Sequence, residues 1–95
     1  MREPLTPQEC AEALTHLEGW QKMDDREAIT KSYKFKDFVS VMNFMNKVAI
    51  VAEEMDHHPE WFNVFNKLDV VLTTHSAGEV TELDIELAKA MDSLL

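Results

Sequence analysis

Residues 37–65, DFVSVMNFMNKVAIVAEEMDHHPEWFNVF, say most about the fold, because they join the most strongly apolar repeat of the chain to two adjacent histidines and a predicted strand. Two apolar stripes run through the first part of this stretch at helical spacing: Phe38, Val41, Met42, Met45, Val48, Ala49 and Ala52, and beside them Phe44, Val48, Val51 and Met55. A helix that is apolar over so wide a face must be covered by more than one neighbour. We expect the helix to end near His57, since Pro59 disfavours the helical conformation at His58.

Strands are expected on both sides of this helix. In AITKSYKF (28–35), apolar side chains alternate with polar ones, which predicts a strand with one wet face; Lys31 is the exception on the apolar side. After the histidines, WFNVFNKLDVVLTTH (61–75) is rich in β-branched and aromatic residues. It predicts a hairpin whose turn lies at Asn66 and Lys67, although Asn-Lys is a weaker turn signal than Asn-Gly.

The first helix is expected in LTPQECAEALTHL (5–17). Thr6 is placed as its N-cap, Pro7 as its first residue, and Glu9 to close a capping box. Gly19 is expected to stop this helix, and residues 20–23 to form a short extended piece.

The last helix is expected to begin after Thr81, which serves as its N-cap, with Asp84 three residues further on. Its apolar stripe would consist of Leu83, Leu87, Ala90 and Leu94. The complete order is then α-β-β-α-β-β-α in one domain, residues 1–95. This order favours an α+β fold in which three helices pack on one face of a four-stranded antiparallel sheet, while the other face is polar or meets a partner.

Composition narrows the possible functions. The formal net charge is −9, from 9 Lys+Arg against 18 Asp+Glu, so direct binding of nucleic acid is disfavoured. Cys10, the only cysteine, excludes an intramolecular disulfide, fits a reducing compartment and is expected in the core. No apolar run is long enough to span a membrane, and we expect no targeting segment or further domain. A chain of 95 residues has a small core, so self-association would be a natural way to bury more apolar surface.

Three of the four histidines lie near one turn and one strand end. His57 follows Glu53 by four residues, so that carboxylate is expected to hold its ring, while Asp84 is expected to orient His75. The ring of His58 should point away from that of His57. Paired imidazoles can serve as acid and base near neutral pH.

Two other interpretations of the histidines remain open from the residues alone. Adjacent histidines with diverging rings chelate one zinc ion poorly, and no HExxH or Cys/His pair is present, so a metal site is disfavoured. The simpler alternative is structural, with His57 and His58 ending a helix and filling a turn, and His75 incidental.

The complete spacing resembles the signature of the pterin-4a-carbinolamine dehydratases, a family also known as the dimerization cofactor of a liver homeodomain transcription factor. The residues that carry the resemblance are Glu53, His57-His58-Pro59, Phe65, His75 and Asp84. It extends over nearly the whole chain and includes Trp20 and the run DHHPEWFNV (56–64). Phe65 stands where the family also accepts tyrosine.

The resemblance implies dehydration of 4a-hydroxytetrahydrobiopterin to quinonoid dihydrobiopterin, with no metal or redox cofactor. It implies a catalytic set of His57, His58 and His75. His58 and His75 would handle the protons at the leaving hydroxyl and at N5, while His57 would fix the pterin. Pterin-lining positions would be Pro59, Thr74, Ser76 and Ala77. Trp20 would be either a pocket wall or a core residue, and Glu53 and Asp84 would support the histidines.

The resemblance also implies a second function, because family members form homodimers or homotetramers and can act as transcriptional coactivators. They do so by binding a helical dimerization segment of a homeodomain factor, for which the second apolar stripe of the long helix, around Phe44, Val48 and Val51, supplies candidates. Core burial is the other expected role of these residues. The expected location is the cytoplasm, with the nucleus in addition for a coactivator.

Overall fold

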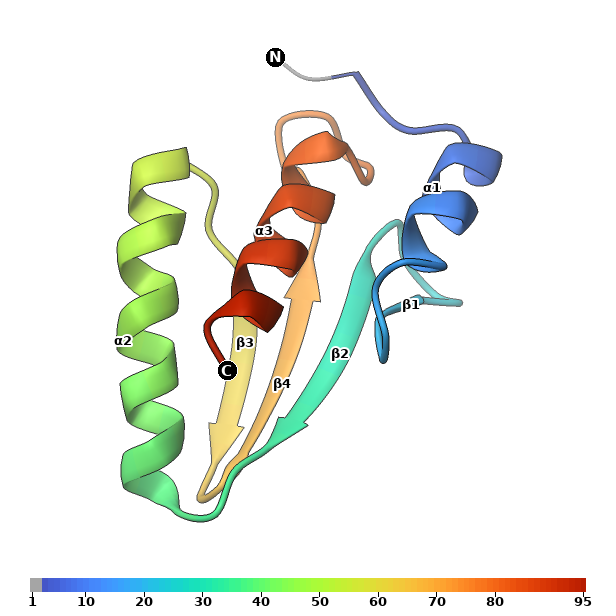
Figure 1. Cartoon of the computed structure of the whole chain (residues 1–95). Coiled ribbons are helices and arrows are strands. Elements are labelled where there is room, and N and C mark those ends of the chain that lie inside the picture. The colour runs from blue at the N-terminus through green and yellow to red at the C-terminus, as the bar shows by residue number, and fades with distance from the viewer. Residues whose placement is uncertain (1–2) are drawn as a thin grey trace.

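A four-stranded antiparallel sheet in the order β1-β2-β4-β3 forms the base of the molecule (Figure 1). The computed structural model describes residues 3–95, so Met1 and Arg2 of the predicted domain lie outside the described residues. The elements are α1 (Pro7–Leu14), β1 (Gln21–Lys22), β2 (Ile29–Lys34), α2 (Phe38–Met55), β3 (Glu60–Val64), β4 (Lys67–Leu72) and α3 (Glu82–Ser93). The predicted order and the α+β class are confirmed. Across residues 3–95, no helix is long and apolar enough to cross a membrane.

The core lies between the sheet and the helices. Alternate residues of β2 and β4 point inward and are fully buried or nearly so: Ile29, Tyr33, Leu68, Val70 and Leu72. The opposite face carries exposed polar side chains such as Ser32, which donates a hydrogen bond to Asp69 Oδ1 at 2.7 Å. Cys10 is buried in the same core, as expected.

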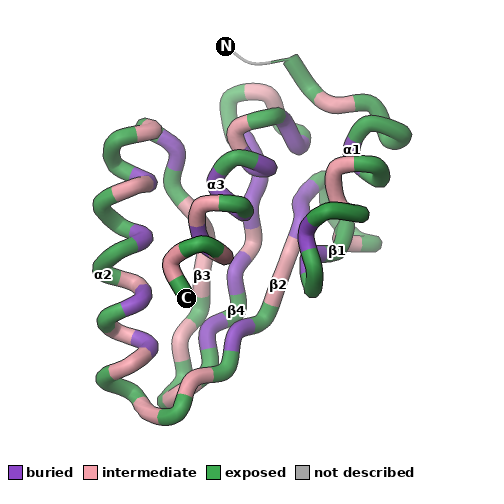
Figure 2. The backbone as a smooth tube through the Cα atoms, in the orientation of Figure 1, coloured by how far each residue is buried: buried purple, intermediate pink, exposed green. Residues whose placement is uncertain are grey.

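The central helix buries a narrower face than its sequence predicts. Its buried residues are Val41, Phe44, Val48 and Ala52, which form a single stripe turned toward the sheet (Figure 2). Phe38 and Ala49 of the predicted first stripe are exposed instead. The expected coverage by more than one neighbour is confirmed, since the sheet and α3 both pack against α2. Its outer side nevertheless faces solvent.

Lys31, the exception in the alternating pattern of β2, has a partner at the edge of the core. Its Nζ donates to Asp92 Oδ1 at 2.9 Å and lies 4.8 Å from the centre of the Tyr33 ring. Asp92 also accepts hydrogen bonds from the Tyr33 hydroxyl at 2.7 Å and from Trp20 Nε1 at 3.1 Å. The Asp92 carboxylate therefore fastens the end of α3 to the sheet. It also neutralises the charge of the half-buried Lys31 ammonium.

The two predicted capping boxes are confirmed, at Thr6 with Glu9 and at Thr81 with Asp84. The capping box at Thr81 sets the orientation of α3, because the buried side chain of Asp84 turns the face of the helix that carries it toward the core. The buried residues of α3 are Asp84, Ile85, Leu87, Ala88 and Met91. The predicted stripe was correct only at Leu87; Leu83, Ala90 and Leu94 are half-buried.

Two predicted boundaries were displaced, whereas α2 ends near His57 as expected. Helix α1 ends at Leu14, because the backbone then tightens into turns with i→i−3 bonds up to Gly19, where φ is 83°. Helix α2 ends at Met55, before His57, because Asp56 adopts the left-handed conformation. The β3–β4 turn lies at Phe65 and Asn66, one residue earlier than predicted, since Lys67 pairs with Val64 in the sheet.

Candidate functional site

The histidines meet where α2 ends and β4 ends. A hollow of about 190 Å³ is lined by Asp56, His57, His58, Thr74, His75, Ser76 and Leu83. These residues come from the end of α2, the loop after β4 and the first turn of α3, and the sheet brings the three segments together. The structure thus gathers the predicted catalytic set of His57, His58 and His75 around one space.

His57 is the buried member of the set and pairs with Asp84. Its Nε2 lies 2.6 Å from Asp84 Oδ1, and both residues are buried. The other oxygen of Asp84 accepts from the Thr74 hydroxyl at 2.8 Å and from the Thr81 N–H at 2.9 Å. The predicted partners were wrong, because Asp84 orients His57 rather than His75, and Glu53 does not contact His57.

Glu53 instead holds His58. Its Oε1 lies 2.8 Å from His58 Nε2, and both side chains are largely exposed. The left-handed residue Asp56 is the reason for the exchange of partners. It turns the chain at the end of α2 so that His57 enters the core, and the ring of His58 lies back against the last helical turns.

His75 is held by a carboxylate that sequence reasoning missed. Its Nε2 lies 2.8 Å from Glu60 Oε2, and Glu60 forms two further bonds with Arg26, at 2.8 Å from Nη1 and 2.9 Å from Nη2. These hydrogen bonds, the Arg26 bonds first, lower the pKa of Glu60 from 4.5 to about 2. Glu60 is therefore an anion at neutral pH, and it can only accept a hydrogen bond from His75.

One geometry is common to all three histidines, since each Nε2 faces a carboxylate oxygen. A carboxylate that accepts a hydrogen bond places the ring proton on Nε2 and leaves Nδ1 as the atom that can accept or release a proton. Within residues 3–95, no group bonds to any of the three Nδ1 atoms. In this same part of the chain no buried side-chain nitrogen or oxygen lacks a partner, so Nδ1 of the buried His57 is reached by solvent.

The other predicted site residues divide into three groups. Thr74 and Ser76 line the hollow, but the Thr74 hydroxyl is buried and already bonded to Asp84. Pro59 and Ala77 are half-buried and lie outside the lining. Trp20 is a core residue, 4% exposed, which was the alternative expected for it.

Three functional candidates were missed by the sequence analysis. Glu60 could have been noticed as the carboxylate directly after Pro59, at the start of β3. Thr81 was recognised only as a cap, whereas its hydroxyl also lies 2.7 Å from that of Thr74. Arg26 had no signal, because 34 residues separate it from Glu60.

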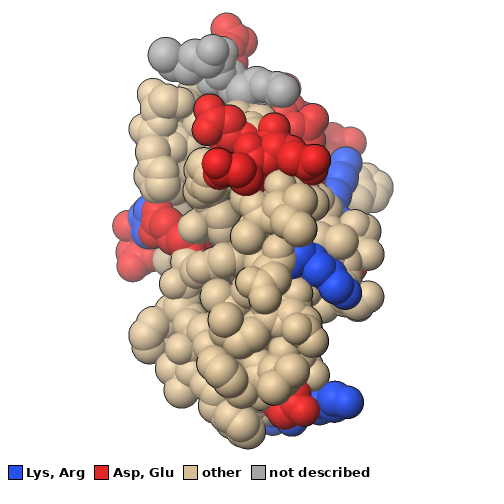
Figure 3. Space-filling model, turned by 90° about the vertical axis from the view of Figure 1, so that its left-hand side faces the viewer, with Lys and Arg blue, Asp and Glu red and all other residues tan. Residues whose placement is uncertain are grey.

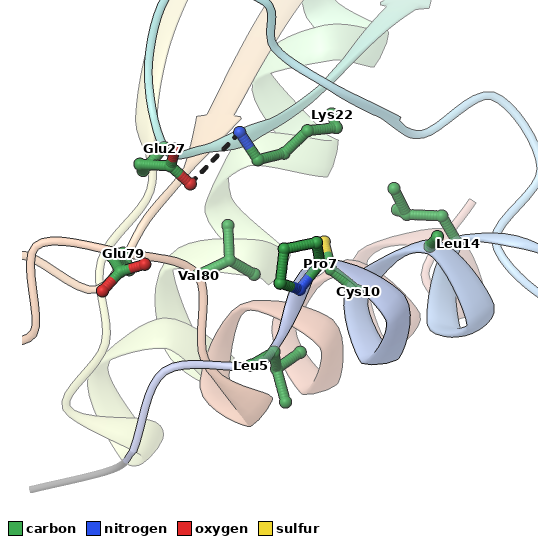
Figure 4. A pocket seen from close by; sticks show the side chains of 9 residues that line it. Leu5, Pro7, Cys10, Leu14, Lys22, Glu27, Glu79 and Val80 are labelled. Carbon is green, nitrogen blue, oxygen red and sulfur yellow. Dashed lines mark ion pairs between the residues drawn. The ribbon is translucent and has the colours of Figure 1, made fainter.

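A second and larger hollow, of about 440 Å³, lies beside α1 and shares no residue with the histidine hollow (Figure 4). Its walls include Leu5, Cys10 and Val80, and its charged pair Lys22–Glu27, 3.3 Å apart, is already neutralised. Burial raises the pKa of the Cys10 thiol, which keeps the thiol protonated. The carboxylates of this hollow, Glu27 and Glu79, have no imidazole beside them in its lining, whereas the smaller hollow is lined by three. The smaller hollow is therefore the better candidate for an active site.

Comparison with known proteins shows the family of this chain. The family model described as pterin 4 alpha carbinolamine dehydratase matches residues 3–94. A relative from Brucella ovis, provisionally named pterin-4-alpha-carbinolamine dehydratase, is 56% identical over 93 residues, covering 98% of this chain and 96% of its own. The same values hold for a relative of that name from Brucella canis.

Solved structures show the same fold. A crystal structure described as a transcriptional coactivator/pterin dehydratase from Brucella melitensis has a TM-score of 0.95 and 55% identity, covering 97% of this chain and 98% of that one. A pterin dehydratase-like protein, described as a RuBisCO assembly factor of the alpha-carboxysome, has a TM-score of 0.69 at 20% identity, covering 83% of this chain and 92% of that one, and shows the fold alone. On the match to residues 3–94 and these near-complete relatives, the chain belongs to the pterin 4 alpha carbinolamine dehydratase family.

Proposed function

We propose that this protein dehydrates 4a-hydroxytetrahydrobiopterin to quinonoid dihydrobiopterin by histidine acid–base catalysis. The observation that carries the proposal is the arrangement of three imidazoles around one hollow, each with a carboxylate at Nε2 and a free Nδ1. The reaction expels the C4a hydroxyl as water and removes the proton from N5. It therefore needs one group to donate a proton and one to accept a proton on the same substrate, and each such group contributes roughly 10²–10⁴-fold to the rate.

Burial separates the roles of the three rings. His57 is rigidly held by Asp84 and almost fully buried, so it is suited to fixing the pterin and its hydroxyl. The side chains of His58 and His75 are 58% and 67% exposed, so both can exchange protons with solvent between turnovers. We assign the proton transfers at the hydroxyl and at N5 to these two. Backbone groups around Thr74 and Ser76, which line the hollow, would contact the pterin, and Pro59 and Ala77, the next residues after His58 and Ser76, would stand at its edge.

The test is the rate at which enzymatically generated 4a-hydroxytetrahydropterin loses its ultraviolet absorbance. Wild-type protein should accelerate the loss, and His58→Ala and His75→Ala should each reduce the acceleration by roughly 10²–10⁴-fold. His16→Ala is the matched control, because this exposed histidine lies in the turn after α1 and should leave the rate unchanged. If folded wild-type protein gives no acceleration, the enzyme proposal fails.

A second candidate function, a coactivator or dimerization cofactor, draws on the outer side of α2. Phe44 and Val48, which were candidates for a helix-binding groove, are buried in the core. Val39 and Ile50 are instead 65% and 64% exposed. Figure 3 shows this side of the molecule as a largely uncharged surface, with acidic side chains gathered toward one end. Such a surface fits helix-to-helix contact, either in a homodimer or homotetramer or with the helical dimerization segment of a homeodomain factor.

The two functions are compatible, and a cytoplasmic location, with the nucleus added for a coactivator, accompanies the proposal. The double substitution Val39→Glu and Ile50→Lys would separate the coactivator function from the dehydratase function. Loss of self-association or of peptide binding in sedimentation measurements, with the dehydratase rate per chain retained, would support the α2 surface as the contact. Unchanged association would exclude that surface.

A further inference from the structure

We infer that Arg26 is a positioning residue for the reaction, acting through Glu60 to hold the ring of His75 with Nδ1 free for the substrate. This inference rests on the proposed function, since His75 matters for catalysis only if the hollow binds a pterin. Arg26 does not line the hollow, and it contacts His75 only through the carboxylate between them.

The contact between Arg26 and Glu60 is two-pronged. Nη1 donates to Oε1 at 2.8 Å and Nη2 donates to Oε2 at 2.9 Å, so both oxygens of Glu60 are fixed in one plane. Oε2 is also the atom that accepts from His75 Nε2 at 2.8 Å. A surface ion pair alone contributes little to stability, but a planar fork restricts where a carboxylate can point. The fork therefore determines the direction in which Glu60 meets the imidazole.

Three hydrogen bonds hold the backbone carbonyls of Arg26 and Glu27. Its carbonyl oxygen accepts from Lys22 Nζ at 3.1 Å and from the Ala28 N–H at 2.9 Å. The neighbouring carbonyl of Glu27 accepts from the Thr73 hydroxyl at 2.7 Å. Thr73 stands two residues before His75, so the turn that carries Arg26 is fastened to the segment that carries the histidine.

The ring of His75 depends on Glu60 for its orientation, and Glu60 depends on the two bonds from Arg26. The histidine is exposed, and within residues 3–95 Glu60 is the only group bonded to its ring. Glu60 is itself part-exposed at the start of an edge strand, so its side chain would be free to turn toward water. A misplacement of a proton-transfer group by about 1 Å can lower a rate on the order of 10²-fold.

The experiment compares Arg26→Ala, Arg26→Lys and Glu60→Gln with wild-type protein. We expect Arg26→Ala to lower kcat about 10-fold to 100-fold with a smaller change in KM, because orientation is lost rather than binding. Arg26→Lys restores a charge without the fork and should recover only part of the rate. Lys67→Ala is the matched control, since it removes a cation from the exposed face of the sheet without touching Glu60.

A second measurement separates positioning from a general structural effect. Carbon-13 relaxation of the histidine rings should show His75 ordered in wild-type protein and as mobile as the exposed His16 in Arg26→Ala. In a His75→Ala background, Arg26→Ala should cause no further loss of rate, because the two act as a unit.

Unchanged ring order and unchanged kcat in Arg26→Ala would overturn the inference, as would a full additional loss in the His75→Ala background. The ring relaxation does not depend on turnover. Failure of wild-type protein to dehydrate the pterin, with His75 still ordered by Arg26, would therefore count against the proposed function and not against the contact.

Discussion

Replacing Asp84 by asparagine should reverse the tautomer of His57 while the chain stays folded. One oxygen of Asp84 accepts from both the Thr81 N–H and the Thr74 hydroxyl, so the amide oxygen of an asparagine must take that place. Its NH2 group then faces His57 Nε2 across the 2.6 Å contact. Nε2 has to accept that hydrogen bond, which moves the ring proton to Nδ1. Nδ1, the atom that would face the proposed pterin, then changes from an acceptor to a donor.

The cost in stability follows from the number of hydrogen bonds. Three bonds to a carboxylate, each worth roughly 1.5–3 kcal/mol, become bonds to a neutral amide worth roughly 0.5–1.5 kcal/mol. The loss is about 1 kcal/mol for each bond, or about 3 kcal/mol, and removal of a buried charge offsets part of it. A domain of this size has about 5–15 kcal/mol of stability, so the variant should fold. Asp84→Ala, which leaves the buried ring without a partner, should lose about 3–5 kcal/mol.

Three measurements test this prediction. Urea unfolding should show the stability loss, long-range proton–nitrogen spectra of His57 should show the proton on Nδ1, and the dehydration rate should fall roughly 10²–10⁴-fold. Asp69→Asn serves as the control, because among residues 3–95 this exposed carboxylate bonds to Ser32 alone, on the outer face of the sheet. An Asp84→Asn protein that keeps the proton on Nε2 and retains most of its rate would contradict the predicted change of tautomer.

Three further predictions concern single contacts. Phe65→Asn should raise the free energy of unfolding by about 0.5–1 kcal/mol in urea denaturation, because the exposed phenylalanine has a φ of 52° that asparagine adopts more easily; a loss of stability would contradict this. Tyr33→Phe should cost about 1 kcal/mol in the same assay, through the lost 2.7 Å hydrogen bond to Asp92; an unchanged midpoint would show that water replaces the hydroxyl. The pKa of Glu60, about 2 in the folded protein against 4.5, is depressed, so the stabilisation by its anion is complete above about pH 4.5 and is lost as the pH falls toward 2. Arg26→Ala should therefore flatten the fall in stability over that window, and an identical acid limb in both proteins would disprove the coupling.

The parts of the fold that rest on local rules were predictable from the sequence. Capping boxes at Thr6 and Thr81 and the alternation in β2 depend on neighbours within a few residues, and the structure confirms them. The hairpin turn was misplaced by one residue because a bulky Phe65 at positive φ contradicts residue preferences. The width of the apolar face of α2 did not predict its burial, because Phe38 and Ala49 of the expected stripe are exposed although the sheet and α3 both pack against the helix.

The three histidines that line one hollow could be picked out from the sequence, but the carboxylates that contact them could not. Glu53 stands four residues before His57 and five before His58, and spacing alone favoured the wrong ring. The left-handed backbone conformation of Asp56 determines that Glu53 contacts His58 rather than His57. The spacing of apolar residues does not predict that conformation. The contact between Arg26 and Glu60 spans 34 residues and depends on how a turn docks against the sheet, which only the tertiary structure shows.

Asp84 belongs at once to the cap of α3, to the hydroxyl network of Thr74 and Thr81, and to the ring of His57. Its loss would damage folding and the proposed chemistry together, whereas His58 and His75, whose side chains are exposed, could change at little cost in stability. A descendant of this protein that gives up the reaction but keeps its surfaces for binding should therefore lose His58 or His75 first. It should retain His57 and Asp84 long after they have ceased to serve catalysis, so these two residues are poor markers of activity, and the exposed pair are better ones.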